Sequence, residues 1–298
     1  MLKSFFKHPE VWMLFVTLSW GINNPVMKHI ITDIDPWTFA GLRFILICVL
    51  SVSSFYLIQK ERFLFRIDAK RDLVWLIAAG FFAYGGYQFF FMEGLSRTPA
   101  FLATLLVCLS PIFATIISYL LKMERYTWRV WVGIGISFIG IFIFKYTGSL
   151  DTLFTGSFIG ELYCMGAALC WAGYSIIMKS ETIQKYPKGQ VNTLTLFFGT
   201  AIVLLYSIDG VVSYPINQIT PFMWALISYT VIFPIFIAYK FYNLSIQKMG
   251  IERTIIFVYL TPIFSGLISI GLGMEDFNIM KLIGSVVVIF GMMLAKKG

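Results

Sequence analysis

Basic side chains inside long apolar stretches are the residues of this chain most able to do chemistry. Lys28, Arg43, Lys179 and Lys240 each lie within such a stretch rather than in a polar connection. A charge there is costly to bury, so it needs an anionic partner or a route to water. An ammonium or guanidinium group can bind a carboxylate or a phosphate, and the planar guanidinium of Arg43 suits these groups best. These residues indicate an anion-binding site.

Two groups of three side chains recur at four-residue spacing, so each group falls on one side of a helix. Their members are Trp20, Asn24 and Lys28 in one group and Trp171, Ser175 and Lys179 in the other. The alternative for both lysines is snorkelling, in which the long stem carries the ammonium group to the lipid headgroups. Pro25 favours a bent helix beside a cavity near Lys28, whereas Lys179 lies closer to the end of its stretch.

Other candidate binding residues accompany Arg43 and Lys240. Pro234 predicts a kink close to Lys240, and Tyr239 directly precedes this lysine. Both cations have a structural alternative, since Lys240 could snorkel and Arg43 could bind backbone carbonyl groups or headgroups. Candidate hydrogen-bonding groups on a further stretch are Tyr84, Tyr87 and Gln88.

Glu93 is the main acid inside an apolar stretch, and Arg97 follows it at i+4. Loss of hydration favours the protonated form of a carboxyl group, whereas a nearby cation favours the charged form. Two roles therefore stay open for Glu93. It either carries a proton that couples to the movement of a substrate, or it forms an ion pair that anchors the end of a helix.

Signals for catalysis, metals and cofactors are absent from the sequence. His8 and His29 have no second metal ligand at useful spacing, and the four cysteines lie inside apolar stretches without a CxxC pattern. Gly133-Ile-Gly-Ile-Ser-Phe-Ile-Gly140 lacks the preceding strand of a nucleotide-binding loop and favours close helix packing. We therefore expect no enzyme, no metal and no cofactor.

Composition places the elements that hold these residues in a membrane. Of the 298 residues, 58% are hydrophobic and only 13% charged, with a mean hydropathy of +0.81. Apolar runs of roughly 20 residues, enough to cross the bilayer core as helices, follow one another with short separators. They predict an all-α integral membrane protein with ten transmembrane helices near residues 11–31, 36–58, 73–95, 99–121, 128–145, 156–179, 190–208, 222–245, 251–273 and 279–295. The first run is too long for a signal peptide.

The second half of the chain repeats the first at a constant offset of 151 residues. Ser110-Pro-Ile-Phe-Ala-Thr-Ile-Ile-Ser118, for example, corresponds to Thr261-Pro-Ile-Phe-Ser-Gly-Leu-Ile-Ser269. Residues 1–150 and 151–298 are thus predicted to be two five-helix repeats, and because five is odd the repeats are inverted. Pro111 and Pro262 fall inside spans at related positions and predict paired hinges, with simple packing bends as the alternative.

Charge orients the predicted spans. Most Lys and Arg residues fall at the termini and in every second connection, whereas the remaining connections hold Asp33, Asp35, Asp151, Asp209, Glu275 and Asp276. The positive-inside rule places both termini in the cytoplasm, and the expected location is the plasma membrane, the inner membrane of a bacterium. The net charge of +8 follows from this asymmetry. It indicates contact with anionic membrane lipids rather than with nucleic acid.

Several motifs resemble those of the EamA-type drug/metabolite transporters. They are Ser19-Trp-Gly-Ile-Asn23, Phe39-Ala-Gly-Leu-Arg-Phe44, Pro111 followed by Lys122-Met-Glu-Arg125, Cys170-Trp-Ala-Gly-Tyr174, and Pro262 through Glu275. The likeness spans nearly the whole chain, although the halves differ at Arg43, whose counterpart is Leu194. The resemblance implies a secondary transporter with a central cavity between the halves, the last span of each repeat at the periphery, and export as the favoured direction.

The excess of cations over acids inside the spans favours a small-molecule substrate with a carboxylate group, such as an amino acid. It would bind near the midplane and move by alternating access, with protons as a candidate coupling ion. One alternative is a phosphate-bearing or lipid-linked anion bound by Arg43 and the lysines. Another is a non-transporting membrane scaffold or receptor. A membrane-embedded enzyme is disfavoured because no nucleophile, base and orienting group occur together.

Overall fold

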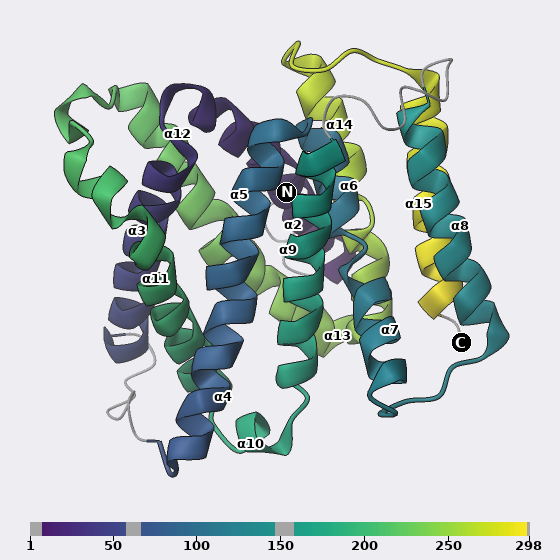
Figure 1. Cartoon of the computed structure of the whole chain (residues 1–298), viewed down its shortest axis with the longest axis horizontal. Coiled ribbons are helices and arrows are strands. Elements are labelled where there is room, and N and C mark those ends of the chain that lie inside the picture. The colour runs from purple at the N-terminus through teal and green to yellow at the C-terminus, as the bar shows by residue number, and fades with distance from the viewer. Residues whose placement is uncertain (1–7, 58–66, 147–157, 297–298) are drawn as a thin grey trace.

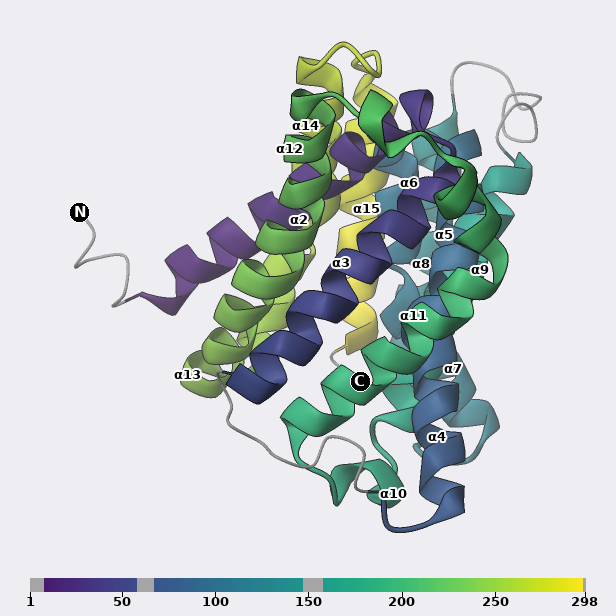
Figure 2. The same cartoon turned by 90° about the vertical axis from the view of Figure 1, so that its left-hand side faces the viewer.

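The computed structural model describes residues 8–57, 67–146 and 158–296, and the regular elements within them are helices. Figures 1 and 2 show them as a bundle of tilted helices. The first half holds α2 (Pro9–Asp33), α3 (Pro36–Leu57), α4 (Lys70–Gly80), the π-helix η1 (Phe81–Gly85), α5 (Gly86–Arg97), α6 (Ala100–Val107), α7 (Ser110–Leu120) and α8 (Trp128–Lys145). The second half holds α9 (Phe158–Ile177), α10 (Glu181–Gln184), α11 (Lys188–Ser213), the 3-10 helix η3 (Ile216–Gln218), α12 (Pro221–Val231), the π-helix η4 (Ile232–Ile237), α13 (Ala238–Val258), α14 (Thr261–Gly271) and α15 (Ile279–Lys296).

Most of these helices are apolar enough for a bilayer. Six segments of the described residues could cross one by length and composition: Pro36–Tyr56, Lys70–Arg97, Ala100–Leu120, Trp128–Lys145, Lys188–Ser213 and Pro221–Gly250. Two shorter apolar helices span Ile256–Gly271 and Ile279–Ala295. The remaining long helices, α2 and α9, are the first of each half and are not among these segments. The predicted all-α membrane architecture agrees with these helices, and the count of ten spans stays a prediction.

The sequence repeat is also a repeat of structure. The offset of 151 residues places α7 on α14 and α8 on α15 with identical bounds, and it places η1 on η4. It also superposes the two left-handed residues that follow α7 and α14, Lys122 with φ 57° and Gly273 with φ 66°. Glycine adopts this conformation without strain and lysine does so at some cost, so the turn geometry is kept despite the change of residue.

The two halves interlock rather than lie side by side. The first helix of each half packs against the other half, α2 against α13 and α14, and α9 against α5 and α7. Equivalent helices also pair directly, since α3 packs on α11 and α8 on α15. The α8–α15 pair lies at one edge of the bundle in Figure 1, as the family resemblance implied for the last span of each repeat. Most of the core therefore lies between the halves.

Each half has one interrupted helix at the predicted proline. The predicted span over 99–121 is two helices, because α6 ends at Val107 and α7 begins at Ser110, just before Pro111. In the second half, α13 ends at Val258 and α14 begins at Thr261, just before Pro262. Proline lacks the N–H group that would continue the preceding helix, which explains both interruptions. Motion about these points stays a prediction.

Candidate functional site

Arg43 on α3 is a buried cation without an acidic partner among the described residues. Its side chain is only 7% exposed, and Nη2 donates a hydrogen bond of 3.3 Å to the carbonyl oxygen of Thr230 on α12. The hydroxyl of Tyr87 interacts electrostatically with the guanidinium group of Arg43. The Nε–H group is buried and has no hydrogen-bond partner in the described part of the chain. An unsatisfied buried donor is costly, so this N–H marks a place for an acceptor from outside the chain.

The contact between Arg43 and Thr230 follows from the proline in η4. Pro234 has no N–H group, so it cannot bond to the carbonyl of Thr230 four residues earlier. Arg43 donates to this free carbonyl oxygen instead. Nearby, the indole Nε1 of Trp20 donates to the carbonyl oxygen of Pro234 at 2.9 Å. The irregular helix is thus held by side chains from α2 and α3, which fixes the orientation of Arg43.

Seven aromatic side chains lie between the helices beside Arg43, and we call them the central aromatic cluster. They are Trp20, Tyr84, Tyr87, Trp171, Tyr174, Tyr239 and Tyr242. The ring of Trp20 lies 5.9 Å from that of Tyr239 and 5.4 Å from that of Tyr242. Rings of Tyr87 and Trp171 are 5.6 Å apart. The cluster draws on both halves.

Tyr239 joins the two sides of this cluster. Its hydroxyl interacts electrostatically with those of Tyr84, Tyr87, Tyr174 and Tyr242, and its side chain is still 36% exposed. An aromatic surface with several hydroxyl groups, a guanidinium at one side and partial exposure is suited to a ligand with an apolar body and an anionic end.

Asn24 and Ser175, two predicted site residues, form internal polar contacts, whereas a third, Gln88, has an unused donor. Asn24 donates to the hydroxyl oxygen of Thr104 at 2.8 Å, and Thr104 in turn contacts Ser265 at 2.9 Å. Ser175 bonds to the carbonyl oxygen of Trp171 within α9. Gln88 is 1% exposed, and its Nε2 has no partner among the described residues. Asn24 therefore holds α2 to α6, whereas Gln88 keeps an unused donor.

Lys28 and Lys179, two of the three lysines of the predicted site, lie away from the cluster. Lys28 donates to the carbonyl oxygens of Leu95 and Ser96 at the end of α5, and Lys179 forms an exposed ion pair of 2.9 Å with Glu124. The ammonium of Lys179 and then the hydroxyl of Tyr126 lower the pKa of the Glu124 carboxyl, so this pair is charged at neutral pH.

Lys240 is exposed, and no hydrogen bond or ion pair joins it to another described residue. It neighbours Tyr239 in the chain but has no contact with Arg43. We expect Lys240→Met to leave substrate transport within about twofold of the parent, since a surface substitution away from buried partners changes free energy by only about 0.5 kcal/mol. Transport into proteoliposomes, normalised to reconstituted protein, measures this effect. If the variant folds normally but loses transport, Lys240 is part of the substrate-binding site.

Glu93 closes α5 beside Arg97. Their side chains form an ion pair at i+4, with exposures of 16% for the glutamate and 46% for the arginine. The guanidinium of Arg97 also lies 5.4 Å from the ring centre of Tyr163. This geometry is that of the helix-end ion pair weighed above. It leaves the proton-coupling role of Glu93 as a proposal.

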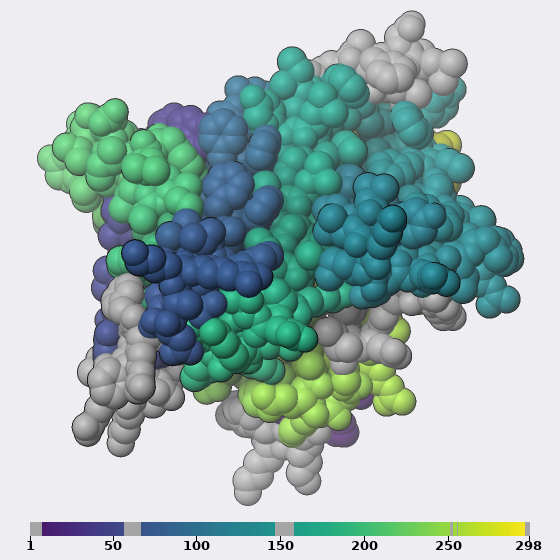
Figure 3. Space-filling view, turned by 60° about the horizontal axis from the view of Figure 1, so that its bottom comes forward, coloured from purple at the N-terminus to yellow at the C-terminus, as the bar shows by residue number. Residues whose placement is uncertain are grey.

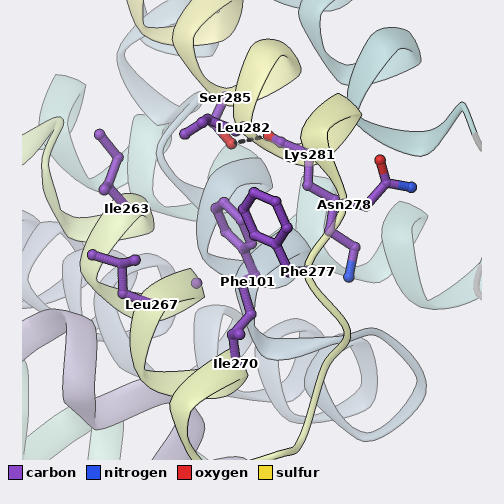
Figure 4. Close-up of a pocket in the computed structure, with 10 residues that line it drawn as sticks. Phe101, Ile263, Leu267, Ile270, Phe277, Asn278, Lys281, Leu282 and Ser285 are labelled. Carbon is purple, nitrogen blue, oxygen red and sulfur yellow. Dashed lines mark hydrogen bonds between the residues drawn. The ribbon is translucent and has the colours of Figure 1, made fainter.

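A small crevice of about 40 Å³ lies elsewhere, between α6, α14 and α15 (Figure 4). Its walls are mainly apolar, with Phe101 and Leu267 among them, and its polar members are Asn278, Lys281 and Ser285. Sites for small molecules typically measure roughly 300–1,000 Å³, so this crevice is too small for a metabolite. Within the described ranges, no group of three or more His, Cys, Asp or Glu side chains is arranged to hold a metal ion.

Sequence reasoning missed parts of this site. Thr230 is not among the predicted site residues and Tyr174 is named only within a family motif, because a free carbonyl group and the meeting of distant tyrosines are properties of the packed structure. The kink at Pro234 was predicted, and it was the only available signal for the unpaired carbonyl of Thr230. Nothing in the sequence distinguished η1 from an ordinary helix.

Comparisons with known proteins extend over the whole bundle. The model of the EamA-like transporter family matches residues 9–146 and 158–296. Among curated proteins, "Uncharacterized transporter YyaM" of Bacillus subtilis (strain 168) is 24% identical over 292 residues, which cover 97% of this chain and 94% of that protein. "Probable amino-acid metabolite efflux pump" of Salmonella typhimurium is 23% identical over 230 residues, or 76% of this chain and 71% of that protein. A solved crystal structure shares the fold with a TM-score of 0.65 at 17% identity, covering 97% of this chain and 96% of that one.

Proposed function

The chain belongs to the EamA-like transporter family, and from this premise we propose that it is a secondary transporter of a small metabolite that carries a carboxylate group. The observation that carries this proposal is the buried Nε–H group of Arg43, which has no partner among the described residues. A guanidinium group offers parallel N–H donors that match a carboxylate. Because Nη2 already contacts Thr230, the free Nε–H is the natural point of attachment.

The central aromatic cluster supports an amino acid or a related compound as substrate. Tyr87 lies close to both Arg43 and Trp171, so a carboxylate on Arg43 would bring an attached apolar group against aromatic rings. Gln88 offers a further unused donor for a polar substrate group. The name of the Salmonella relative, an amino-acid metabolite efflux pump, agrees with this substrate class and favours export.

The repeat supports alternating access as the mechanism. We propose ten spans in two inverted five-helix repeats, bounded at residues 1–150 and 151–298, in the plasma membrane with both termini in the cytoplasm. Inverted repeats give a carrier two related conformations that open toward opposite sides of the membrane. Substrate bound between the halves would then be exposed to each side in turn, with Pro111 and Pro262 as hinge positions.

Substrate-dependent thermal stabilisation tests this function. Purified protein should melt at a higher temperature with one or more amino acids or amino-acid derivatives, because a ligand that binds only the folded state stabilises it. Compounds from the same set should enter or leave proteoliposomes. Stabilisation by phosphate esters alone would assign a phosphate-bearing substrate instead. Transport of none of the metabolites in a broad mixture would favour a scaffold.

Proton coupling through Glu93 is the least supported part of this proposal, and one variant tests it. Glu93→Gln keeps the shape of the side chain but removes the titrating group. If Glu93 carries a proton, this variant should lose transport driven by a pH gradient and retain exchange of substrate across the membrane. If the ion pair with Arg97 only anchors α5, gradient-driven transport should match the parent, which would exclude Glu93 as the coupling site.

A further inference from the structure

The turn between α5 and α6 is held by one cation and one carboxylate. Lys28 of α2 donates to the carbonyl oxygens of Leu95 at 2.5 Å and Ser96 at 3.0 Å, at the C-terminal end of α5. Glu275 accepts from the backbone N–H of Phe101 at 3.0 Å, at the N-terminal end of α6. Each charge thus matches the dipole of the helix end that it binds. Glu275 also pairs with Lys281 and is only 6% exposed.

The repeat places an equivalent lysine and glutamate at the opposite end of the bundle. Counterparts of Lys28 and Glu275 at the offset of 151 residues are Lys179 and Glu124. These two pair with each other at 2.9 Å and are 55% and 46% exposed. Among the described residues, no hydrogen bond joins either of them to α13, which holds the counterpart of the α5–α6 turn at Gly250, with φ 82°. At one end of the bundle a lysine and a glutamate therefore bind a turn. At the opposite end the equivalent lysine and glutamate bind each other.

The two ends of the bundle also differ in how deeply repeat-related residues are buried. Helix α6 packs against α2 and α14, whereas the matching end of α13 has at most a marginal contact with α9 and α7 in the described residues. Leu105 of α6 is fully buried, and its counterpart Ile256 is 46% exposed. Figure 3 views the molecule from the end where α10 and the end of α13 come forward. The bundle is closed at the Lys28 end and looser at the Lys179 end.

We propose that these repeat-related lysine–glutamate pairs form an exchanging latch that selects which end of the transporter is closed. In the present conformation Lys28 and Glu275 hold the α5–α6 turn, and the Lys28 end is closed. In the opposite conformation Lys179 and Glu124 separate and bind the turn at Gly250. Lys179 then binds the carbonyl groups before this turn, and Glu124 binds the N–H groups after it. Lys28 and Glu275 then leave the α5–α6 turn. This inference rests on the proposed alternating-access function.

The energetics of the two arrangements suit such an exchange. An exposed ion pair contributes little to stability, so the Lys179–Glu124 pair can break at small cost. Charge-assisted hydrogen bonds at buried helix ends contribute more. Because both ends use the same residue types at repeat-related turns, exchanging them keeps the two states close in free energy. A carrier needs this balance, since both states must be populated during the cycle.

Cysteine reactivity at Leu105 and Ile256 tests the latch. In a variant whose four native cysteines are replaced by alanine, Ile256→Cys should react with a water-soluble maleimide and Leu105→Cys should react slowly. Adding Lys28→Met or Glu275→Gln should raise labelling of Leu105→Cys and lower that of Ile256→Cys. The expected shift is about tenfold, the effect of losing one charge-assisted hydrogen bond. Lys179→Met and Glu124→Gln should leave Leu105→Cys unreactive, because they weaken only the opposite state.

Arg97→Gln is the matched control, because Arg97 is an exposed cation on the same turn that takes no part in the latch. It should change neither labelling rate. Equal labelling at both reporters with a lowered melting temperature would indicate local unfolding and contradict the latch, as would unchanged rates in Lys28→Met and Glu275→Gln. Failure of the latch is distinguishable from failure of the proposed substrate. The first leaves amino-acid stabilisation intact, and the second leaves the exchange of labelling intact.

Discussion

Replacing Arg43 by glutamine should lower substrate affinity by about 10- to 100-fold, since the charge-assisted hydrogen bond from the Nε–H group, which contributes roughly 1.5–3 kcal/mol, is lost. Glutamine keeps an N–H donor for the carbonyl oxygen of Thr230 and removes the charge and the free Nε–H group. The variant should therefore fold, because the polar contact that follows from Pro234 can be kept. Binding measured by thermal stabilisation and transport in proteoliposomes should fall together.

Arg43→Lys tests whether the charge alone is enough to bind the substrate. Lysine restores the positive charge but presents a single ammonium group, which cannot donate in parallel to a carboxylate and reach Thr230 as well. It should recover only a small part of the lost affinity. Lys240→Met serves as the comparison, because it removes an exposed cation near the same cluster. If Arg43→Gln keeps the affinity of the parent, Arg43 only binds the carbonyl group of Thr230 that Pro234 leaves unpaired. This result would contradict the proposed carboxylate site.

The sequence predicts the features that depend on local residues. It does not predict those that form only when distant segments of the chain pack together. The helical class, the repeat and the interruptions near Pro111 and Pro262 follow from hydropathy, the fixed offset and proline chemistry. Arg43 stood out because a guanidinium in an apolar stretch is rare. Its partner could not be predicted, since Thr230 is 187 residues away and offers only a backbone oxygen.

Lys28 and Lys179 show what a sequence repeat cannot predict. The repeat relates Lys28, within α2, to Lys179, which lies just after the end of α9, and the sequence favours a cavity beside Lys28 but a position near the end of its stretch for Lys179. One binds helix carbonyl groups and the other an exposed glutamate, because the two ends of the bundle differ in conformation. A sequence repeat specifies which residues correspond. It does not specify which contacts each of them makes, since those depend on differences in packing between the two ends.

The α8–α15 pair gives the largest expected effect on stability. Both helices approach through glycines at related positions, and a side chain at Gly133 would meet the backbone nitrogen of Ala295 at 2.4 Å and the carbonyl oxygen of Gly291 at 2.7 Å. Backbone atoms cannot move aside as a flexible side chain can. Close approach of this kind is what small residues provide between membrane helices.

Gly133→Leu should therefore destabilise the protein by about 3 kcal/mol, the upper end of the usual cost of overpacking. Gly135→Leu is a control on the same helix, because nothing lies within 4 Å of a Cβ atom there. Leucine favours helix over glycine by roughly 0.8 kcal/mol, so the control should be neutral or slightly stabilising. Melting curves of both variants in detergent compare the two. A similar melting temperature for both would mean that α8 and α15 separate easily, and the close pairing would then contribute little to the stability of the bundle.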